Sequence, residues 1–170
     1  DRRYRISRRL GTIEWEDESS WRPAGFLDAM TIYDLLCCAK DGAALSGRYA
    51  QAEHLPGTMH GANPAKGAFD DFAARCDEDP EKLKKACLAL GGVELPMGEL
   101  SFQVPLFDFL TVMVQFWSSD DEFPAVFKLM WDENVLQFLR FETVCYAARF
   151  LVNRLQALMG LTVEEAEGHM

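Results

Sequence analysis

Three side chains that could do chemistry, Arg48, His54 and His60, lie within residues 42–63, a segment with no hydrophobic periodicity. Long ordered loops carry function more often than they merely connect elements. Backbone N–H groups beside Arg48 could hold an anion together with its guanidinium, or Arg48 could simply pair with a nearby acid. The two histidines lack the converging ligands of a metal centre, so we predict ordinary surface histidines and no metal site.

A second candidate is the acidic run Asp120-Asp121-Glu122, which separates two apolar stretches. Such a run is typical of a solvated turn. Crowded carboxylates would raise one pKa if the turn folded under the loop that bears Arg48. Asp121 and Glu122 therefore join the three residues above as candidate ligand-binding residues, and no residue is assigned a catalytic role.

The five cysteines do not form a recognisable reactive set. No two are spaced as C-x-x-C, and all lie in predicted helices. Cys37 and Cys38 lie near the C-terminal end of a helix, where the helix dipole raises a thiol pKa. We interpret the five as small, mostly buried hydrophobes of a reducing compartment. The glycine spacing of nucleotide-binding loops is absent as well, so the cofactor stays unknown.

Composition bounds the protein to a single globular domain. The 170 residues are 49% hydrophobic, which is enough for one core. The formal net charge of −10 argues against binding to nucleic acid or to anionic membranes. No apolar run reaches the roughly 20 residues that cross a bilayer, and no signal peptide pattern is present, so we predict a cytoplasmic protein. We expect one domain over residues 1–161 and an acidic tail over residues 162–170, whose last three residues resemble a cloning remnant.

The elements that must position the candidate residues centre on residues 100–131. Residues 109–117 and 125–131 are almost unbroken apolar sequence rich in β-branched and aromatic types, which is typical of paired strands. We predict a hairpin that is buried on both faces and turns at Asp120. That register places Trp117 opposite Phe123, Met113 opposite Phe127 and Phe109 opposite Trp131.

The N-terminal segment carries five arginines in residues 2–9, followed by four acids in residues 14–18. One interpretation is a basic arm for nucleic acid, and the other, which we favour, is a second hairpin whose charges neutralise each other. A turn over residues 8–11 would pair Tyr4 with Trp15, Ile6 with Ile13, Arg5 with Glu14 and Arg3 with Glu16.

Apolar residues at helical spacing predict helices at residues 24–40, 64–76, 80–90 and 139–159. The first would turn inward a stripe formed by Phe26, Met30, Tyr33 and Cys37. The fold class is therefore α+β. We expect one antiparallel sheet of about four to six strands, from the N-terminal hairpin and residues 93–131, packed by these helices.

Several stretches carry a family resemblance: Ile32 to Leu36, Leu45 to Tyr49, His54 to Gly57, Pro105 followed by Phe107-Asp108-Phe109, Phe116-Trp117, Asp121 to Ala125, and Trp131-Asp132. Together they resemble the uncharacterised prokaryotic family called domain of unknown function 3786, up to about Leu158. Asp121 to Ala125 is the most specific stretch. The resemblance implies no established activity. Relatives occur mainly in anaerobic bacteria and archaea, some joined to iron–sulfur cluster segments, which these 170 residues do not contain.

Two functions stay open at this point. We favour a non-catalytic binding module of an anaerobe, for a protein partner or a small ligand, with residues 42–63 and 118–124 as its recognition surface. The alternative is an enzyme or cofactor-handling accessory protein whose polar site is built from the same two segments. Convergence of Arg48 or His54 with the acids of the turn in a concave apolar pocket would favour the alternative. The oligomeric state is left open.

Overall fold

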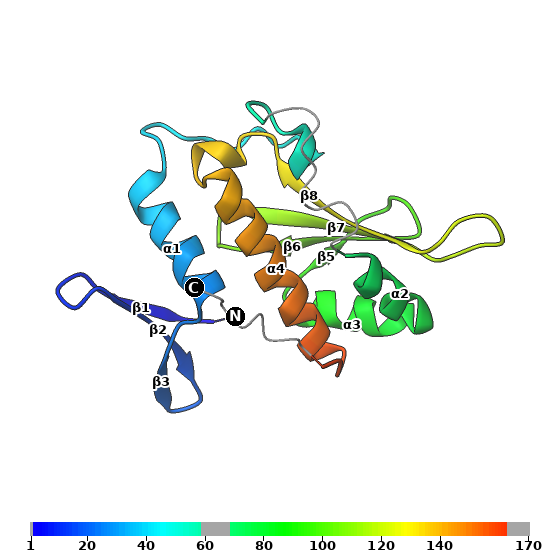
Figure 1. Ribbon diagram of the computed structural model, residues 1–170, viewed down its shortest axis with the longest axis horizontal. Coiled ribbons are helices and arrows are strands. Elements are labelled where there is room, and N and C mark those ends of the chain that lie inside the picture. Colours follow the sequence, from blue (N-terminus) through cyan, green and yellow to red (C-terminus); the bar gives the residue numbers. More distant parts are fainter. Residues whose placement is uncertain (1, 59–68, 163–170) are drawn as a thin grey trace.

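The computed structural model describes residues 2–58 and 69–162, which form two antiparallel sheets and four α-helices (Figure 1). The smaller sheet holds β1 (Tyr4–Ser7), β2 (Thr12–Asp17) and β3 (Ser20–Pro23). The larger sheet has the order β4-β8-β7-β6-β5, with bounds Tyr49–Gln51, Val126–Asp132, Thr111–Trp117, Leu100–Pro105 and Val93–Glu94. The helices are α1 (Phe26–Cys38), α2 (Asp70–Glu78), α3 (Pro80–Ala89) and α4 (Phe141–Leu158). The predicted α+β class is confirmed.

The core lies between one face of the five-stranded sheet and the helices. Side chains alternate along β7, so Val112, Val114 and Phe116 all point to this face, where they are fully buried. α4 crosses the same face and brings Val144 and Leu151 into the core (Figure 1). α2 contacts β8, and α3 contacts β5 and β6, so these two short helices cover the remaining part of the sheet.

The register of the β7–β8 hairpin differs from the predicted one by three residues. Phe127 lies opposite Phe116 rather than Met113. β8 begins only at Val126, so residues 118–125 all belong to the connection, and the observed pairing brings the most buried residues of both strands onto one face. The opposite face is half-buried along both strands, so the prediction of a hairpin buried on both faces is wrong.

The pairing predicted for the N-terminal hairpin is confirmed. Tyr4 lies opposite Trp15 and Arg5 opposite Glu14, with 2.7 Å between the charged groups of the second pair. The hairpin does not join the main sheet, however, as the single predicted sheet required. A tight turn at Glu18, which has a positive φ of 51°, returns the chain at once as β3 and completes a separate sheet. β3 is short and mostly exposed, so its sequence carries no clear strand pattern.

α1 packs with the face opposite to the predicted one. Its buried side chains are Asp28, Thr31, Ile32 and Asp34, and its exposed ones include Phe26, Tyr33, Leu36 and Cys37. The helix is apolar around most of its circumference, so the spacing of apolar residues does not decide which face packs. The acids decide it, because Asp28 accepts a hydrogen bond from β1 and Asp34 accepts others from the start of α4.

The predicted helices at residues 80–90 and 139–159 are confirmed as α3 and α4. α3 ends at a glycine pair, where the N–H of Gly92 donates to the Cys87 carbonyl over 2.9 Å. A Cβ at Gly92 would lie 2.7 Å from that carbonyl oxygen, so only glycine fits this turn. Residues 64–68 of the second predicted helix, and the tail from residue 163, lie outside the described residues. No described helix is both long and apolar enough to cross a bilayer.

Candidate functional site

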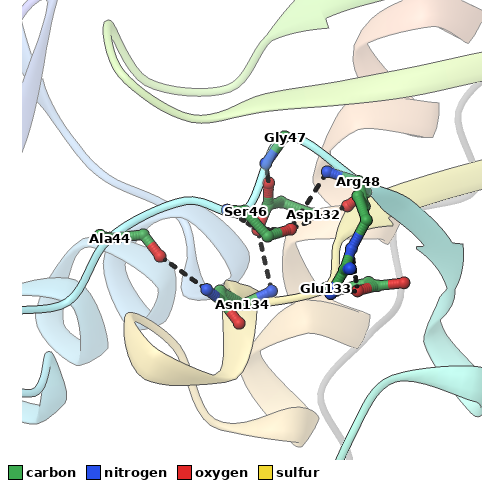
Figure 2. Close-up of polar contacts among 7 residues, drawn as sticks. All are labelled: Ala44, Ser46, Gly47, Arg48, Asp132, Glu133 and Asn134. Carbon is green, nitrogen blue, oxygen red and sulfur yellow. Dashed lines mark hydrogen bonds and ion pairs between the residues drawn. The ribbon is translucent and has the colours of Figure 1, made fainter.

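Asp132, at the C-terminal end of β8, carries a buried carboxylate. The loop that precedes β4, which contains Ser46 and Gly47, folds over this carboxylate (Figure 2). Its Oδ1 accepts hydrogen bonds from the N–H of Ser46 at 3.0 Å and the Ser46 hydroxyl at 3.1 Å. Its Oδ2 accepts the N–H of Gly47 at 2.7 Å. The N–H of Asn134 adds a further bond to Oδ1 at 2.8 Å. Three of these hydrogen bonds therefore anchor the loop to Asp132, and the fourth comes from the chain that follows β8.

The conformation of Gly47 makes this arrangement possible. Its φ of 73° lies in the left-handed region, which turns the N–H groups of two successive residues toward one oxygen-rich point. These backbone N–H groups form a cradle for an anion, which is the protein's own Asp132 carboxylate, and the Arg48 guanidinium that the sequence-based alternative included is not part of it. Asn134 fixes the other side of the loop, because its side-chain amide donates to the Ala44 carbonyl at 2.9 Å.

Asp132 stays ionised in this cradle. Burial alone raises the pKa of a carboxyl group, but the backbone N–H groups of Ser46, Asn134 and Gly47 outweigh it and hold the pKa of Asp132 below its ordinary value. A buried carboxylate with its hydrogen bonds satisfied inside the protein stabilises the loop. It offers little capacity for an external ligand.

Arg48 points away from the cradle and pairs with Glu133 at 2.7 Å. Of the two roles left open for Arg48, pairing with a nearby acid is the observed one, and its side chain is 76% exposed. His54 lies exposed at the end of a 3-10 turn, Ala52–His54. His60 lies outside the described residues.

The acidic tip of the β7–β8 hairpin forms its own turn. The carboxylate of Asp120 accepts the N–H groups of Glu122 and Phe123, both at 2.8 Å, which lowers the pKa of Asp120. Asp121 and Glu122 are exposed. The tip lies just before Val126, the first residue of β8. Arg48 lies beside Asp132, the last residue of β8, and the two ends of this strand are about 20 Å apart. The structure therefore keeps Arg48 apart from Asp121 and Glu122, at opposite ends of β8 (Figure 1).

The tip is instead attached to α2. The N–H and hydroxyl of Ser119 donate to the carboxylate of Asp77 at 2.9 and 2.6 Å. These two bonds lower the pKa of Asp77, chiefly through the hydroxyl, so this carboxylate is charged at neutral pH. Sequence reasoning missed Asp77, because no local pattern places it beside Ser119, 42 residues away.

A cavity of about 380 Å³ opens between α2 and the start of β8. It is lined by Asp70, Ala74, Asp77, Ser119, Pro124, Ala125, Val126 and Phe127. One wall is apolar and the other carries two carboxylates from a single helix face. The spacing of Asp70 and Asp77, two helical turns apart, is the one sequence signal that could have indicated this wall.

The described residues contain no group of three or more His, Cys, Asp or Glu side chains that could hold a metal ion. Burial raises the pKa of Cys76 and Cys87 to about 12, and the two fully buried thiols are core residues. The thiol of Cys38 donates a hydrogen bond to the carboxylate of Asp34, and this bond raises the pKa of the thiol. These three thiols are therefore protonated and poorly nucleophilic at neutral pH.

Comparison with known proteins adds a family. The family model described as "Domain of unknown function (DUF3786)" matches residues 1–154. The chain belongs to this family. The matched residues include both sheets, the cradle of Asp132 and the cavity beside the hairpin tip. No curated protein and no solved structure matches the chain.

Proposed function

We propose that this chain is a non-catalytic binding module that takes a basic, partly apolar segment of a partner protein into the cavity between α2 and the β7–β8 tip. The observation that carries the proposal is the composition of that cavity. Phe127, Pro124 and their neighbours supply an apolar wall, and Asp70 and Asp77 supply two carboxylates facing the same space. Apolar cavities with a few convergent polar groups are the usual form of a binding site.

Charge favours a basic ligand. Asp77 is held in its ionised form by Ser119, and Asp70 is exposed in the first turn of α2. A Lys or Arg side chain between them would form charge-assisted hydrogen bonds, while its aliphatic stem lay on the apolar wall. The net charge of −10 would also attract a basic partner over long range and accelerate its association.

An exposed aromatic side chain adds contact area next to the cavity. Phe123 is 65% exposed and directly precedes Pro124 in the cavity wall. Exposed aromatic residues at the rim of a pocket are frequent anchors of protein interfaces. The free state of all five cysteines supports a reducing setting such as the cytoplasm for this interaction.

The alternative of an enzyme or cofactor-handling site built from residues 42–63 and 118–124 has no support from the geometry of the described residues. Arg48 is engaged by Glu133 at the opposite end of β8 from the acids of the tip, and His54 is exposed. A catalytic pocket would gather Arg48 and these acids, and the structure keeps them apart.

Selection of random 12-residue peptides displayed on phage tests the proposal, with the whole chain as bait. We expect enriched peptides that combine Lys or Arg with aromatic or large aliphatic residues. Asp70→Lys should weaken their binding about tenfold or more in a fluorescence anisotropy titration, because it replaces attraction by repulsion at the site.

The matched control is Asp71→Lys. Asp71 is the neighbouring exposed acid in the same first turn of α2, but it does not line the cavity. Asp71→Lys changes the net charge and the charge near the helix N-terminus in the same way as Asp70→Lys. The affinity of Asp71→Lys for the peptides should therefore stay within about threefold of that of the unmodified chain. Absence of enriched peptides, or equal loss of binding in both variants, would contradict the proposal.

A further inference from the structure

The outer faces of α1 and α4 together form a surface that is apolar in its centre. Phe26 is 64% exposed and Tyr33 is 51% exposed, although both are large apolar residues of α1. Phe26 contacts Tyr146 of α4 edge to face, with 5.2 Å between ring centroids. The two helices lie side by side on the same side of the molecule (Figure 1). The exposed aromatic residues of α1 are therefore continuous with the outer face of α4.

This surface carries few charges on its α1 half. The two acids of α1, Asp28 and Asp34, are both buried on the opposite face of the helix. An acidic chain of net charge −10 repels a second copy of itself over most of its surface. The charge-free outer face of α1 is a place where two copies could meet without that repulsion.

The α4 half of the surface is complementary to itself. Glu142 and Arg149 are both exposed, lie two helical turns apart, and flank Tyr146 on the same face of the helix. Within residues 2–58 and 69–162, neither side chain has an ion-pair partner. If two α4 helices cross antiparallel at Tyr146, Glu142 of each chain faces Arg149 of the other. A two-fold interface requires such self-complementarity.

We infer that α1 and α4 form the interface of a homodimer, with Tyr146 and Phe26 near the two-fold axis and two reciprocal Glu142–Arg149 pairs at its sides. The apolar stripe Phe26, Met30 and Tyr33 of one α1 then packs beside the other chain's helices. The dimer would thus cover apolar side chains of α1 that the orientation set by Asp28 and Asp34 leaves exposed.

The size of this surface predicts a weak dimer. Two adjacent helices, of about 20 and 27 Å, present a footprint on the order of 400 to 500 Å² per chain. A standard stable interface buries about 800 Å² per partner, so this one belongs to the small, transient class. We expect dissociation in the micromolar range.

Sedimentation equilibrium over roughly 2 to 200 μM tests the inference. The average molar mass in solution should rise with concentration from that of one chain, 19.2 kDa, toward twice that value. Glu142→Arg alone and Arg149→Glu alone should each weaken dimerisation at least tenfold, because each creates two like-charge contacts across the axis. The double variant restores opposite charges and should dimerise within threefold of the unmodified chain.

Phe26→Asp should also abolish the dimer. Its matched control is Phe123→Asp, at a phenylalanine of 65% exposure on the hairpin tip, which should leave dimerisation unchanged. Circular dichroism and thermal unfolding establish that each variant is folded, and recovery in the double charge variant excludes damage to α4 as the cause. A chain that stays monomeric at 200 μM, or a double variant as weak as the single ones, overturns the inference. Neither outcome depends on peptide binding at the cavity beside the tip.

Discussion

At the scale of single residues, Asp132 should be the most sensitive polar position of the site region. Asp132→Ala removes the acceptor of four hydrogen bonds. The N–H groups of Ser46, Gly47 and Asn134 then lose the carboxylate to which they donate. We expect the free energy of unfolding to fall by about 3 kcal/mol, since unpaired buried donors are costly. Urea denaturation at neutral pH measures this change.

The neighbouring Glu133 provides the control for that prediction. Glu133→Gln breaks the ion pair with Arg48, whose side chain is 76% exposed, and solvent screens such a pair. Its effect should stay below about 0.5 kcal/mol. Equal losses for the two variants would show that the buried cradle contributes no more than a surface ion pair.

The same cradle shows how far residue-level sequence reasoning reaches. The sequence of Ser46, Gly47 and Arg48 left two alternatives open, an anion held by backbone N–H groups together with the Arg48 guanidinium, or a pairing of Arg48 with a nearby acid. The backbone N–H groups hold a carboxylate, whereas the guanidinium pairs with Glu133 instead. The anion could not be identified, because Asp132 lies 86 residues further along the chain from Ser46 and no local pattern connects them. The pairing of Asp77 with Ser119 was missed for the same reason. His60 stays a prediction without a structural answer.

At the scale of elements, Asp34 joins α1 to α4. Arg140, the residue before α4, donates its N–H to one oxygen of the Asp34 carboxylate and its Nε to the other, both at 2.6 Å. The first turn of α4 has no side-chain cap of its own, so this acid from another helix replaces one. Burial raises the pKa of Asp34, but hydrogen bonds from Arg140, Cys38 and Thr143 outweigh it and lower the pKa to about 2.

This lowered pKa predicts the pH dependence of stability. The ordinary pKa of 3.8 applies to the unfolded chain, so the stabilisation from Asp34 is complete above about pH 4 and is lost as the pH falls toward 2. Asp34→Asn should lower the free energy of unfolding at neutral pH by about 2 kcal/mol and flatten its decline between those pH values. Urea unfolding followed by circular dichroism at several pH values measures both.

Asp41→Asn is the control for Asp34, because Asp41 is an exposed acid just beyond α1. It should leave the decline of stability with acid unchanged. Parallel curves for the unmodified chain and Asp34→Asn would show that Asp34 does not contribute the acid-labile part of the stability.

The same acids explain which element-level predictions succeeded. The bounds of α3 and α4 follow from proline, glycine and apolar spacing, which are local signals. The orientation of α1 does not follow from local signals. Asp28 and Asp34 can be buried because Tyr4 and Arg140, from other elements, donate hydrogen bonds to them. Local periodicity treats an acid as an outward residue, and a tertiary partner reverses that rule.

At the scale of the whole molecule, the division into two sheets could not be predicted, although the pairing inside the first was. The charges and aromatics of β1 and β2 fix their mutual register. No local sequence pattern in β1 and β2 predicts whether these two strands pair with the main sheet. The edge of the main sheet beside β8 is taken by β4, whose three residues follow a loop and carry no clear strand pattern. Short strands selected by tertiary pairing are the part of this fold that its sequence leaves undetermined.

The two sheets should also differ in stability. No residue of β1, β2 or β3 is buried, whereas β6, β7 and β8 contribute fully buried residues to the core. The small sheet is attached through the Tyr4 hydroxyl, which donates to Asp28 over 3.1 Å, and through Arg2, which lies 4.0 Å from the same carboxylate. Burial, followed by the charge of Asp28, raises the pKa of Tyr4 to about 12, so the phenol remains a donor at neutral pH.

Native-state hydrogen exchange should therefore show that β1 and β2 open without the rest of the molecule. Their amides should exchange with a lower opening free energy than those of β7, and Tyr4→Phe should reduce their protection about fivefold by removing one hydrogen bond to a charged acceptor. The β7 amides should be unaffected. Tyr49→Phe is the control, because it removes a phenol that bonds to Thr111 within the main sheet. If β1 and β7 exchange with the same free energy, or if Tyr4→Phe lowers protection equally in both, the two sheets form one cooperative unit and Asp28 does not act as a separate attachment point.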